Sequence, residues 1–253
     1  MTPPPTNDLV EREKDFWEST DDAFLRARRV IRTSIGEFNR YTDVHDYYDP
    51  AGKVVLDYGC GNGDLTFELL ERGAERVVGF DISESLIDEA RARARQLDVA
   101  DRAEFHVADA HDTGFPDATF DLVVGIAILH HLLLPEALLE IRRVLKPGGR
   151  AAFVEPLQHN PILRLGRALT PAGRTPDEHP LTQDDWDVCR SVFPGFRHHE
   201  RELLTLVFIP LNWILPQSGK RWLARKLSRL DDRILVGREG VRKHARLTIL
   251  VLE

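Results

Sequence analysis

The stretch Val54–Asp64 constrains the fold more than any other part of this chain of 253 residues. A short apolar run ends in an acidic residue, Asp57, and three glycines then occupy alternate positions: Gly59, Gly61 and Gly63. Apolar residues at helical spacing follow, so the sequence predicts a buried strand, a tight turn and the start of a helix. In α/β proteins a nucleotide binds at this junction, because glycines let the backbone approach the ligand closely.

The turn differs from the dinucleotide-binding pattern G-x-G-x-x-G, whose third glycine would stand where this chain has Asp64. A carboxylate aimed at a pyrophosphate would repel it, so the sequence disfavours NAD and FAD. The turn instead suits a nucleoside ligand that has no phosphate and carries a positive charge.

Four further segments each contain an apolar strand pattern with an acidic, glycine-rich or polar end. They are Val77–Ser83, Val107–Ala110, Phe120–His131 and Arg143–Glu155. With the glycine turn, these segments have the order and spacing of the class I S-adenosylmethionine (SAM) dependent methyltransferases, which the chain resembles over roughly residues 50–156. The resemblance implies a methyltransferase of the small-molecule type, with SAM as cofactor and S-adenosyl-L-homocysteine as product.

The pattern of apolar residues predicts alternating strands and helices over this region. Strands are expected at 53–57, 76–81, 103–108, 120–126 and 149–155, with helices at 63–72, 83–97 and 135–146. Such alternation gives a parallel sheet with right-handed crossovers. The resemblance implies an α/β fold with a doubly wound, seven-stranded, mostly parallel sheet in the order 3-2-1-4-5-7-6, whose last strand is antiparallel. The sixth and seventh strands are then expected at Leu203–Ile209 and Leu247–Leu252.

The length favours one large domain over residues 1–253. Around a SAM-binding core at 50–156, we expect a helical N-terminal cap at 1–49 and two acceptor-side insertions, at 157–202 and 211–245. These insertions, after strands five and six, would cover a pocket for a small molecule rather than leave an open groove for a polymer.

The resemblance also implies which residues bind the cofactor. Asp81, at the end of the second strand, is expected to accept hydrogen bonds from both ribose hydroxyls. Asp109 is expected to accept from the adenine amino group, with Ile82 and Ala110 near the ring. The remaining expected cofactor residues lie in the glycine turn and at the end of the fourth strand: Asp57, Gly59, Cys60, Gly61, Gly63 and Ile126. The alternative roles are a helix cap for Asp81 and a surface loop position for Asp109.

The candidate catalytic residues are expected at the same edge of the sheet: His130, His131 and His159, with Glu155 and His179 as further candidates there. Methyl transfer from a sulfonium is an in-line displacement, so positioning and desolvation can supply much of the rate. A base is needed only if the acceptor must lose a proton. His131 is favoured as the base or as an acceptor-orienting residue, and a packing or capping role for the histidine pair is the alternative. No metal is expected.

Charge and composition limit the partners. The net charge of −7 argues against a general nucleic-acid binder, so no nucleic-acid partner is expected beside the small-molecule acceptor. Two cysteines imply no disulfide framework and favour a cytoplasmic location. The mostly apolar run 203–216 is too short to be a transmembrane segment. The basic segment 220–246 is expected to be a solvated helix face, with contact to an anionic substrate or a lipid surface as the alternative.

Three other functions stay open at this point. The basic segment would favour a methyltransferase for RNA or protein, and intact cofactor residues are also compatible with a SAM-binding module without catalysis. An NAD-linked oxidoreductase is disfavoured by Asp64. The acceptor atom (O, N or C) and the oligomeric state stay open as well.

Overall fold

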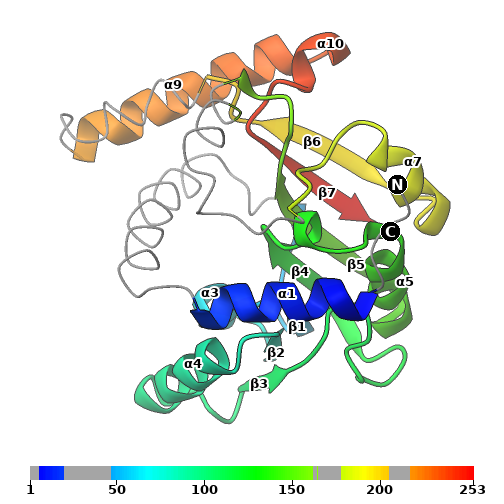
Figure 1. Ribbon diagram of the computed structural model, residues 1–253. Coiled ribbons are helices and arrows are strands. Elements are labelled where there is room, and N and C mark those ends of the chain that lie inside the picture. Colours follow the sequence, from blue (N-terminus) through cyan, green and yellow to red (C-terminus); the bar gives the residue numbers. More distant parts are fainter. Residues whose placement is uncertain (1–5, 20–46, 162–163, 165–177, 205–216) are drawn as a thin grey trace.

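The computed structural model describes residues 6–19, 47–161, 164, 178–204 and 217–253. These residues form a seven-stranded sheet in the order β3-β2-β1-β4-β5-β7-β6 (Figure 1). The strands are β1 (Val54–Tyr58), β2 (Arg76–Asp81), β3 (Ala103–Val107), β4 (Phe120–Ile126), β5 (Leu145–Pro156), β6 (Arg197–Arg201) and β7 (Leu247–Leu252). β7 is antiparallel to β5 and β6, and the other neighbouring strands are parallel. The predicted fold class and strand order are confirmed.

Helices cover both faces of this sheet. They are α1 (Thr6–Ser19), α3 (Asp64–Glu71), α4 (Glu84–Gln96), the 3₁₀ helix η2 (Leu129–His131), α5 (Leu134–Val144), α7 (Asp185–Val192), α9 (Gln217–Leu235) and α10 (Glu239–Arg242). Successive strand residues point to opposite faces. Val55 therefore packs in the core under α3 and α4, whereas Leu56 and Tyr58 pack in the core under α5 and α7. Among the described residues, no helix is long and apolar enough to cross a membrane.

The sixth strand differs from the sequence prediction. We expected it at Leu203–Ile209, but β6 runs over Arg197–Arg201, and residues 205–209 lie outside the described part of the chain. β6 is at the edge of the sheet and has the polar sequence RHHER. Edge strands often carry charged residues that oppose pairing with other chains, so an apolar pattern does not reveal them. The other core elements are confirmed, except that β5 begins earlier, at Leu145.

The connection from β6 to β7 begins and ends at one edge of the sheet. Pro156 at the end of β5 pairs with Leu247 at the start of β7, and Arg201 at the end of β6 pairs with the same Leu247. Residues 202–246, including α9 and α10, therefore leave and rejoin the sheet at the carboxyl edge, where the parallel strands end. Ligands bind at this edge in open α/β sheets.

α9 packs against β6 through one of its faces. Asp231 and Leu235 on that face are buried, and Asp231 Oδ1 accepts a hydrogen bond of 3.1 Å from the backbone N–H of Leu204. The next residue, Asp232, forms an ion pair with Arg201 of β6. Burial raises the pKa of Asp231 to about 6. The carboxylates of Glu202 and Asp232 also raise this pKa, while backbone hydrogen bonds lower it.

Asp231 should make the stability of the protein depend on pH. Its folded-state pKa of about 6 lies above the value near 3.9 of an unfolded chain. The free energy of unfolding should therefore fall as the pH rises through about 4 to 7, because the folded state holds the proton more tightly. We expect Asp231→Asn to raise the free energy of unfolding at pH 7.5 by about 1–3 kcal/mol and to weaken this dependence, as measured by urea denaturation.

The exposed neighbour of Asp231 provides the control for this experiment. Asp232→Asn removes the same charge from an adjacent, solvated position and should give no such gain. A less stable Asp231→Asn protein at pH 7.5 would show that the ionised carboxylate is favourable in the fold.

Candidate functional site

The glycine turn joins β1 to α3 at the carboxyl edge of the sheet. Gly59 and Gly61 have φ angles of +74° and +53°, in the left-handed region. A Cβ at Gly59 would lie 2.7 Å from Cγ1 of Ile128, so a larger residue does not fit there. A Cβ at Gly61 would have no heavy atom of the described residues within 4 Å. As far as the described residues extend, the backbone at Gly61 therefore borders space in which a ligand can lie.

Neighbouring residues fix this turn to the sheet. The N–H of Cys60 donates to Phe80 O of β2 at 2.8 Å, and the Cys60 side chain is buried. Gly63 is the N-cap residue of α3. Asp57 is buried, and its Oδ2 accepts a hydrogen bond of 2.6 Å from Oγ1 of Thr66 on α3. Asp57 thus connects β1 to the helix that follows the turn.

The carboxylate of Asp64 is directed to Arg93 of α4, whereas we expected it to face the ligand. Its Oδ1 lies 2.7 Å from Nη1 of Arg93 on α4, and the same nitrogen donates to Asn62 O at 2.7 Å. The guanidinium compensates much of the negative charge of Asp64. The repulsion that we expected between Asp64 and a pyrophosphate is therefore weaker than the sequence indicated.

Asp81 connects the end of β2 to the glycine turn. Its Oδ2 accepts from the N–H of Gly61 at 2.9 Å, and its Oδ1 accepts from the N–H of Ser83 at 3.0 Å. The cap of α4 is Ser83, whose Oγ accepts from the N–H of Leu86 at 3.4 Å, so the alternative cap role of Asp81 is not observed. Burial raises the pKa of Asp81, although hydrogen bonds from the backbone N–H groups of Ser83, Gly61 and Ile82 lower it in part. A carboxylate has about four acceptor positions, so Asp81 keeps acceptor capacity beyond these three amides.

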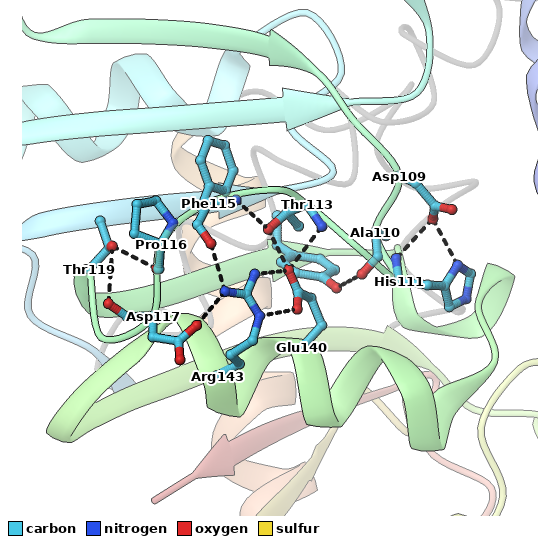
Figure 2. Close-up of polar contacts among 11 residues, drawn as sticks. Asp109, Ala110, His111, Thr113, Phe115, Pro116, Asp117, Thr119, Glu140 and Arg143 are labelled. Atoms are coloured by element: carbon cyan, nitrogen blue, oxygen red, sulfur yellow. Dashed lines mark hydrogen bonds and ion pairs between the residues drawn. The ribbon is translucent and has the colours of Figure 1, made fainter.

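Asp109 lies in the loop after β3 and contacts His111 (Figure 2). Its Oδ1 accepts from the backbone N–H of His111 at 2.8 Å and lies 2.9 Å from Nδ1 of the same residue. Burial alone would raise the pKa of Asp109, but the hydrogen bonds and charge of His111 lower it overall. Nε2 of His111 accepts from the N–H of Leu133 at 3.0 Å. The sequence analysis missed His111, whose position two residues after an aspartate is the signal for such a local turn.

The loop after β3 is anchored to α5 by a buried polar network (Figure 2). Oε1 of Glu140 accepts from N and Oγ1 of Thr113 at 2.9 Å and 2.5 Å. Arg143 donates to both carboxylate oxygens of Glu140 at 2.7 Å. Nearer the site, Tyr58 donates its hydroxyl hydrogen to the carbonyl of Ala110, whose side chain is in the core. The loop that carries the predicted adenine contacts is thus held in one conformation.

The end of β4 also faces the ligand edge. Ile126 leaves 42% of its surface exposed, although β4 is otherwise mostly buried. The following Ala127 has φ of +57°, which is uncommon for a residue with a Cβ, and its N–H donates to Val154 O at 2.8 Å. Backbone strain of this kind concentrates at functional sites. Ile82, which follows Asp81, is half-buried.

Glu155 organises the turn after β4 from the neighbouring strand β5. It is fully buried, and its Oε1 accepts from the N–H groups of Ile128 and Leu129 at 3.0 Å and 2.8 Å. Its Oε2 lies 2.7 Å from Nδ1 of His130. Glu155 and His130 therefore have a capping function at this turn, which was the alternative considered for the histidine pair.

His131 is buried beside His130, with ring centroids 4.1 Å apart. Its Nδ1 lies 3.3 Å from Oε1 of Glu13, a buried residue of α1. A positive charge on His131 would lower the pKa of Asp81, so the two side chains are near enough to interact electrostatically. Glu13 was not predicted from the sequence. Its position four residues after Leu9 places it on the same helix face, and this spacing could have indicated that it is buried.

Polar atoms of His130, His131 and Glu178 converge at this edge. One ligand atom from each lies within 4.8 Å of the others. Such a group can orient a polar substituent of an acceptor or coordinate a divalent cation. His159 is half-buried, and its carbonyl lies 3.0 Å from Nδ1 of His244, in the segment before β7.

Known proteins are similar to the central part of this chain. Residues 55–149 match the family model of a methyltransferase domain. The 27-O-demethylrifamycin SV methyltransferase of Amycolatopsis mediterranei (strain S699) is 43% identical over 106 residues, which cover 41% of this chain and 38% of that protein. The demethylmenaquinone methyltransferase of Symbiobacterium thermophilum is 39% identical over 157 residues, which cover 60% of this chain and 62% of that protein.

A solved structure shares the fold over more of the chain. The geranyl diphosphate C-methyltransferase of Streptomyces coelicolor A3(2), crystallised with Mg²⁺, geranyl diphosphate and S-adenosyl-L-homocysteine, has a TM-score of 0.61 at 18% identity. The match covers 85% of this chain and 78% of that one.

The strand order and the glycine turn at the carboxyl edge define the class I methyltransferase fold. With the match of residues 55–149 to the methyltransferase-domain model, they make the core of this chain similar to the class I SAM-dependent methyltransferases. The chain spans 38% and 62% of the lengths of the two relatives in sequence, so this similarity concerns the core of the fold.

Proposed function

We propose that this protein transfers a methyl group from SAM to a small-molecule acceptor and releases S-adenosyl-L-homocysteine. The observation that carries the proposal is the contact between the N–H of Gly61 and Oδ2 of Asp81, 2.9 Å apart. It places a carboxylate that keeps some acceptor capacity next to the backbone of Gly61, where a Cβ would meet no heavy atom of the described residues within 4 Å. A ribose diol can use the carboxylate while the rest of the ligand lies along the glycines.

Each part of the cofactor has a proposed partner. Asp81 would bind the ribose hydroxyls, and the Oδ2 atom of Asp109, which is in neither bond to His111, would accept from the adenine amino group. Ile82 and Ala110 would flank the ring. Backbone groups of the glycine turn and of Ile126 would line the methionine part.

On the acceptor side, we assign positioning roles rather than a dedicated base. His130 would hold the turn after β4 through Glu155, because their bond of 2.7 Å is buried. His131 and Glu178 would orient the acceptor, since their polar atoms converge beside the cofactor side of the site. An activated sulfonium needs little further chemical assistance once the acceptor is aligned and water is excluded. The insertions 157–202 and 211–245, which include His159, would form the remaining acceptor wall.

We further propose a hydrophobic acceptor and a cytoplasmic location. Ile126 presents apolar surface at the carboxyl edge, and the two sequence relatives are named for a rifamycin and a demethylmenaquinone. The free, buried thiols Cys60 and Cys189 suit a reducing compartment.

Titration calorimetry tests the cofactor directly. We expect SAM and S-adenosyl-L-homocysteine to bind with dissociation constants on the order of micromolar, and NAD to bind far more weakly. Binding of NAD in preference to both SAM species would overturn the proposal. A methyl-transfer assay with radiolabelled SAM and a panel of quinones and polyketide phenols then tests the acceptor class.

Gly61→Ala should lower the affinity for SAM at least tenfold, because the new methyl group occupies space that the ligand needs. Gly52→Ala is the matched control: Gly52 has φ of +66°, and a Cβ there also has no described heavy atom within 4 Å. Gly52 precedes β1 and lies at the opposite end of that strand. Both variants should lose about 1–2 kcal/mol of stability, but only Gly61→Ala should lose SAM binding. Equal SAM affinity of the two folded variants would contradict the proposed ligand position.

A further inference from the structure

α9 has an exposed face on the side away from β6. On the side toward β6, every fourth residue is at least partly buried. Leu223 and Leu227 are half-buried, and Asp231 and Leu235 are buried. The exposed residues of the other side, here named the α9 outer face, are Trp222, Lys226, Arg229, Leu230, Arg233 and, just after the helix, Val236.

The outer face exposes large apolar side chains. Trp222 is 63% exposed, Leu230 is 44% exposed and Val236 is 72% exposed. The described part of the chain has seven exposed large apolar residues, and these are three of them. Exposed apolar side chains are therefore most frequent on α9 and the residue that follows it. Single exposed apolar residues are common on protein surfaces, but several on one helix face indicate a binding surface.

Basic side chains surround these apolar residues. Lys226, Arg229 and Arg233 are exposed on the same face, and Nζ of Lys226 lies 5.7 Å from the centroid of the Trp222 ring. The neighbouring acid, Asp232, is paired with Arg201 of β6. The whole chain has a net charge of −7, so the positive charge of this face is opposite in sign to the net charge of the protein. Lys and Arg interleaved with Trp and aliphatic residues are typical of helices that lie on anionic lipid surfaces.

The position of α9 relates this face to the proposed active site. The connection 202–246 leaves the sheet at the end of β6 and returns at the start of β7, both at the carboxyl edge. Figure 1 shows α9 and α10 beside those strand ends. A surface bound by α9 would therefore lie on the side where an acceptor reaches the site.

We propose that the α9 outer face binds the surface of an anionic phospholipid bilayer. Trp222, Leu230 and Val236 enter the interfacial region, and the basic side chains contact lipid phosphates. A nucleic acid would satisfy the basic residues but would leave the aliphatic side chains exposed to water, so the lipid surface is favoured. The inference goes beyond the proposed function, because bilayer binding requires no methyl transfer. For a hydrophobic acceptor, it brings the protein to the phase in which the acceptor dissolves.

Vesicle flotation with the full chain tests this proposal. We expect binding to vesicles of phosphatidylcholine mixed with phosphatidylglycerol, weak binding to phosphatidylcholine alone, and loss of binding at high salt. The triple variant K226Q/R229Q/R233Q should bind the anionic vesicles roughly 100-fold more weakly. The matched control is R76Q/R95Q/R102Q, which removes the same charge from exposed residues near the starts of β2 and β3, at the opposite edge of the sheet. This control should bind like the unaltered protein.

Tryptophan fluorescence tests whether the apolar residues enter the lipid. Anionic vesicles should shift the emission to shorter wavelength, and Trp222→Phe should remove most of this shift while retaining binding. Trp222→Ala should weaken binding several-fold. Circular dichroism and SAM calorimetry on the same preparations report folding and cofactor binding, so loss of vesicle binding and loss of SAM binding are separate results.

Three outcomes would overturn the proposal: no binding of the unaltered protein to anionic vesicles at low salt, an equal loss in the control triple variant, or binding of single-stranded RNA in place of vesicles through the same outer-face residues.

Discussion

Replacing Glu155 by alanine is expected to lower the free energy of unfolding by about 3–5 kcal/mol. The substitution leaves three donors without their acceptor: the partly buried N–H of Ile128, and the buried N–H of Leu129 and Nδ1 of His130. Each unsatisfied buried donor costs about 1–3 kcal/mol. Urea denaturation at neutral pH measures the loss.

Two variants show whether burial causes this effect. Glu155→Gln retains an acceptor for the two backbone amides and should lose only about 1–2 kcal/mol. Glu104→Ala breaks a similar contact, 2.7 Å from Oε1 to Nε2 of His106, but both side chains are at least 40% exposed. Its cost should stay below about 1 kcal/mol. If Glu155→Ala cost no more than Glu104→Ala, the turn after β4 would not depend on Glu155.

Replacing Asp81 by alanine is expected to weaken SAM binding at least tenfold, and by up to about 10⁴-fold. Two charge-assisted hydrogen bonds to the ribose would be lost, each contributing about 1.5–3 kcal/mol. The acceptor for the N–H of Gly61 would also be lost, so the turn itself would be held less firmly. Calorimetry measures the affinity, and circular dichroism verifies the fold.

Asp64→Ala is the control on the same turn. Asp64 is only three residues from Gly61, but its carboxylate is directed to Arg93, so its loss should change SAM affinity little. A folded Asp81→Ala protein with unaltered affinity would show that the ribose is held elsewhere. An equal loss in both variants would indicate a general effect of charge rather than a specific contact.

Local sequence patterns predicted the parts of the site that depend on neighbouring residues. The strand, the glycine turn and the helix start are contiguous, so apolar periodicity and glycine spacing were sufficient. The position of Asp81 followed from its place at the end of the next strand. β7 is fully buried and apolar, and it was predicted at its observed bounds.

Features that depend on distant or polar partners were not predicted. The contact between His131 and Glu13 joins residues 118 positions apart, and no local pattern encodes such a pair. The bonds of Glu155 to the turn after β4 likewise cross from one strand to another. Asp64 was interpreted from its position alone, whereas its orientation depends on Arg93 of α4. β6 was missed because an edge strand does not require apolar residues on both faces.

The point at which residues 202–246 join the sheet has a consequence for how such proteins diversify. The register between β5 and β7 is set by six residue pairs, from Ala151 with Leu252 to Pro156 with Leu247, none of which belongs to that connection. Outside the residues that pack in the core, such as Leu235 and Ala245, its length and composition can therefore change without altering the strands that carry the glycine turn and Asp81. Under the proposed function, acceptor choice and bilayer contact can vary through this one segment, while the strands that carry the glycine turn and Asp81 stay the same.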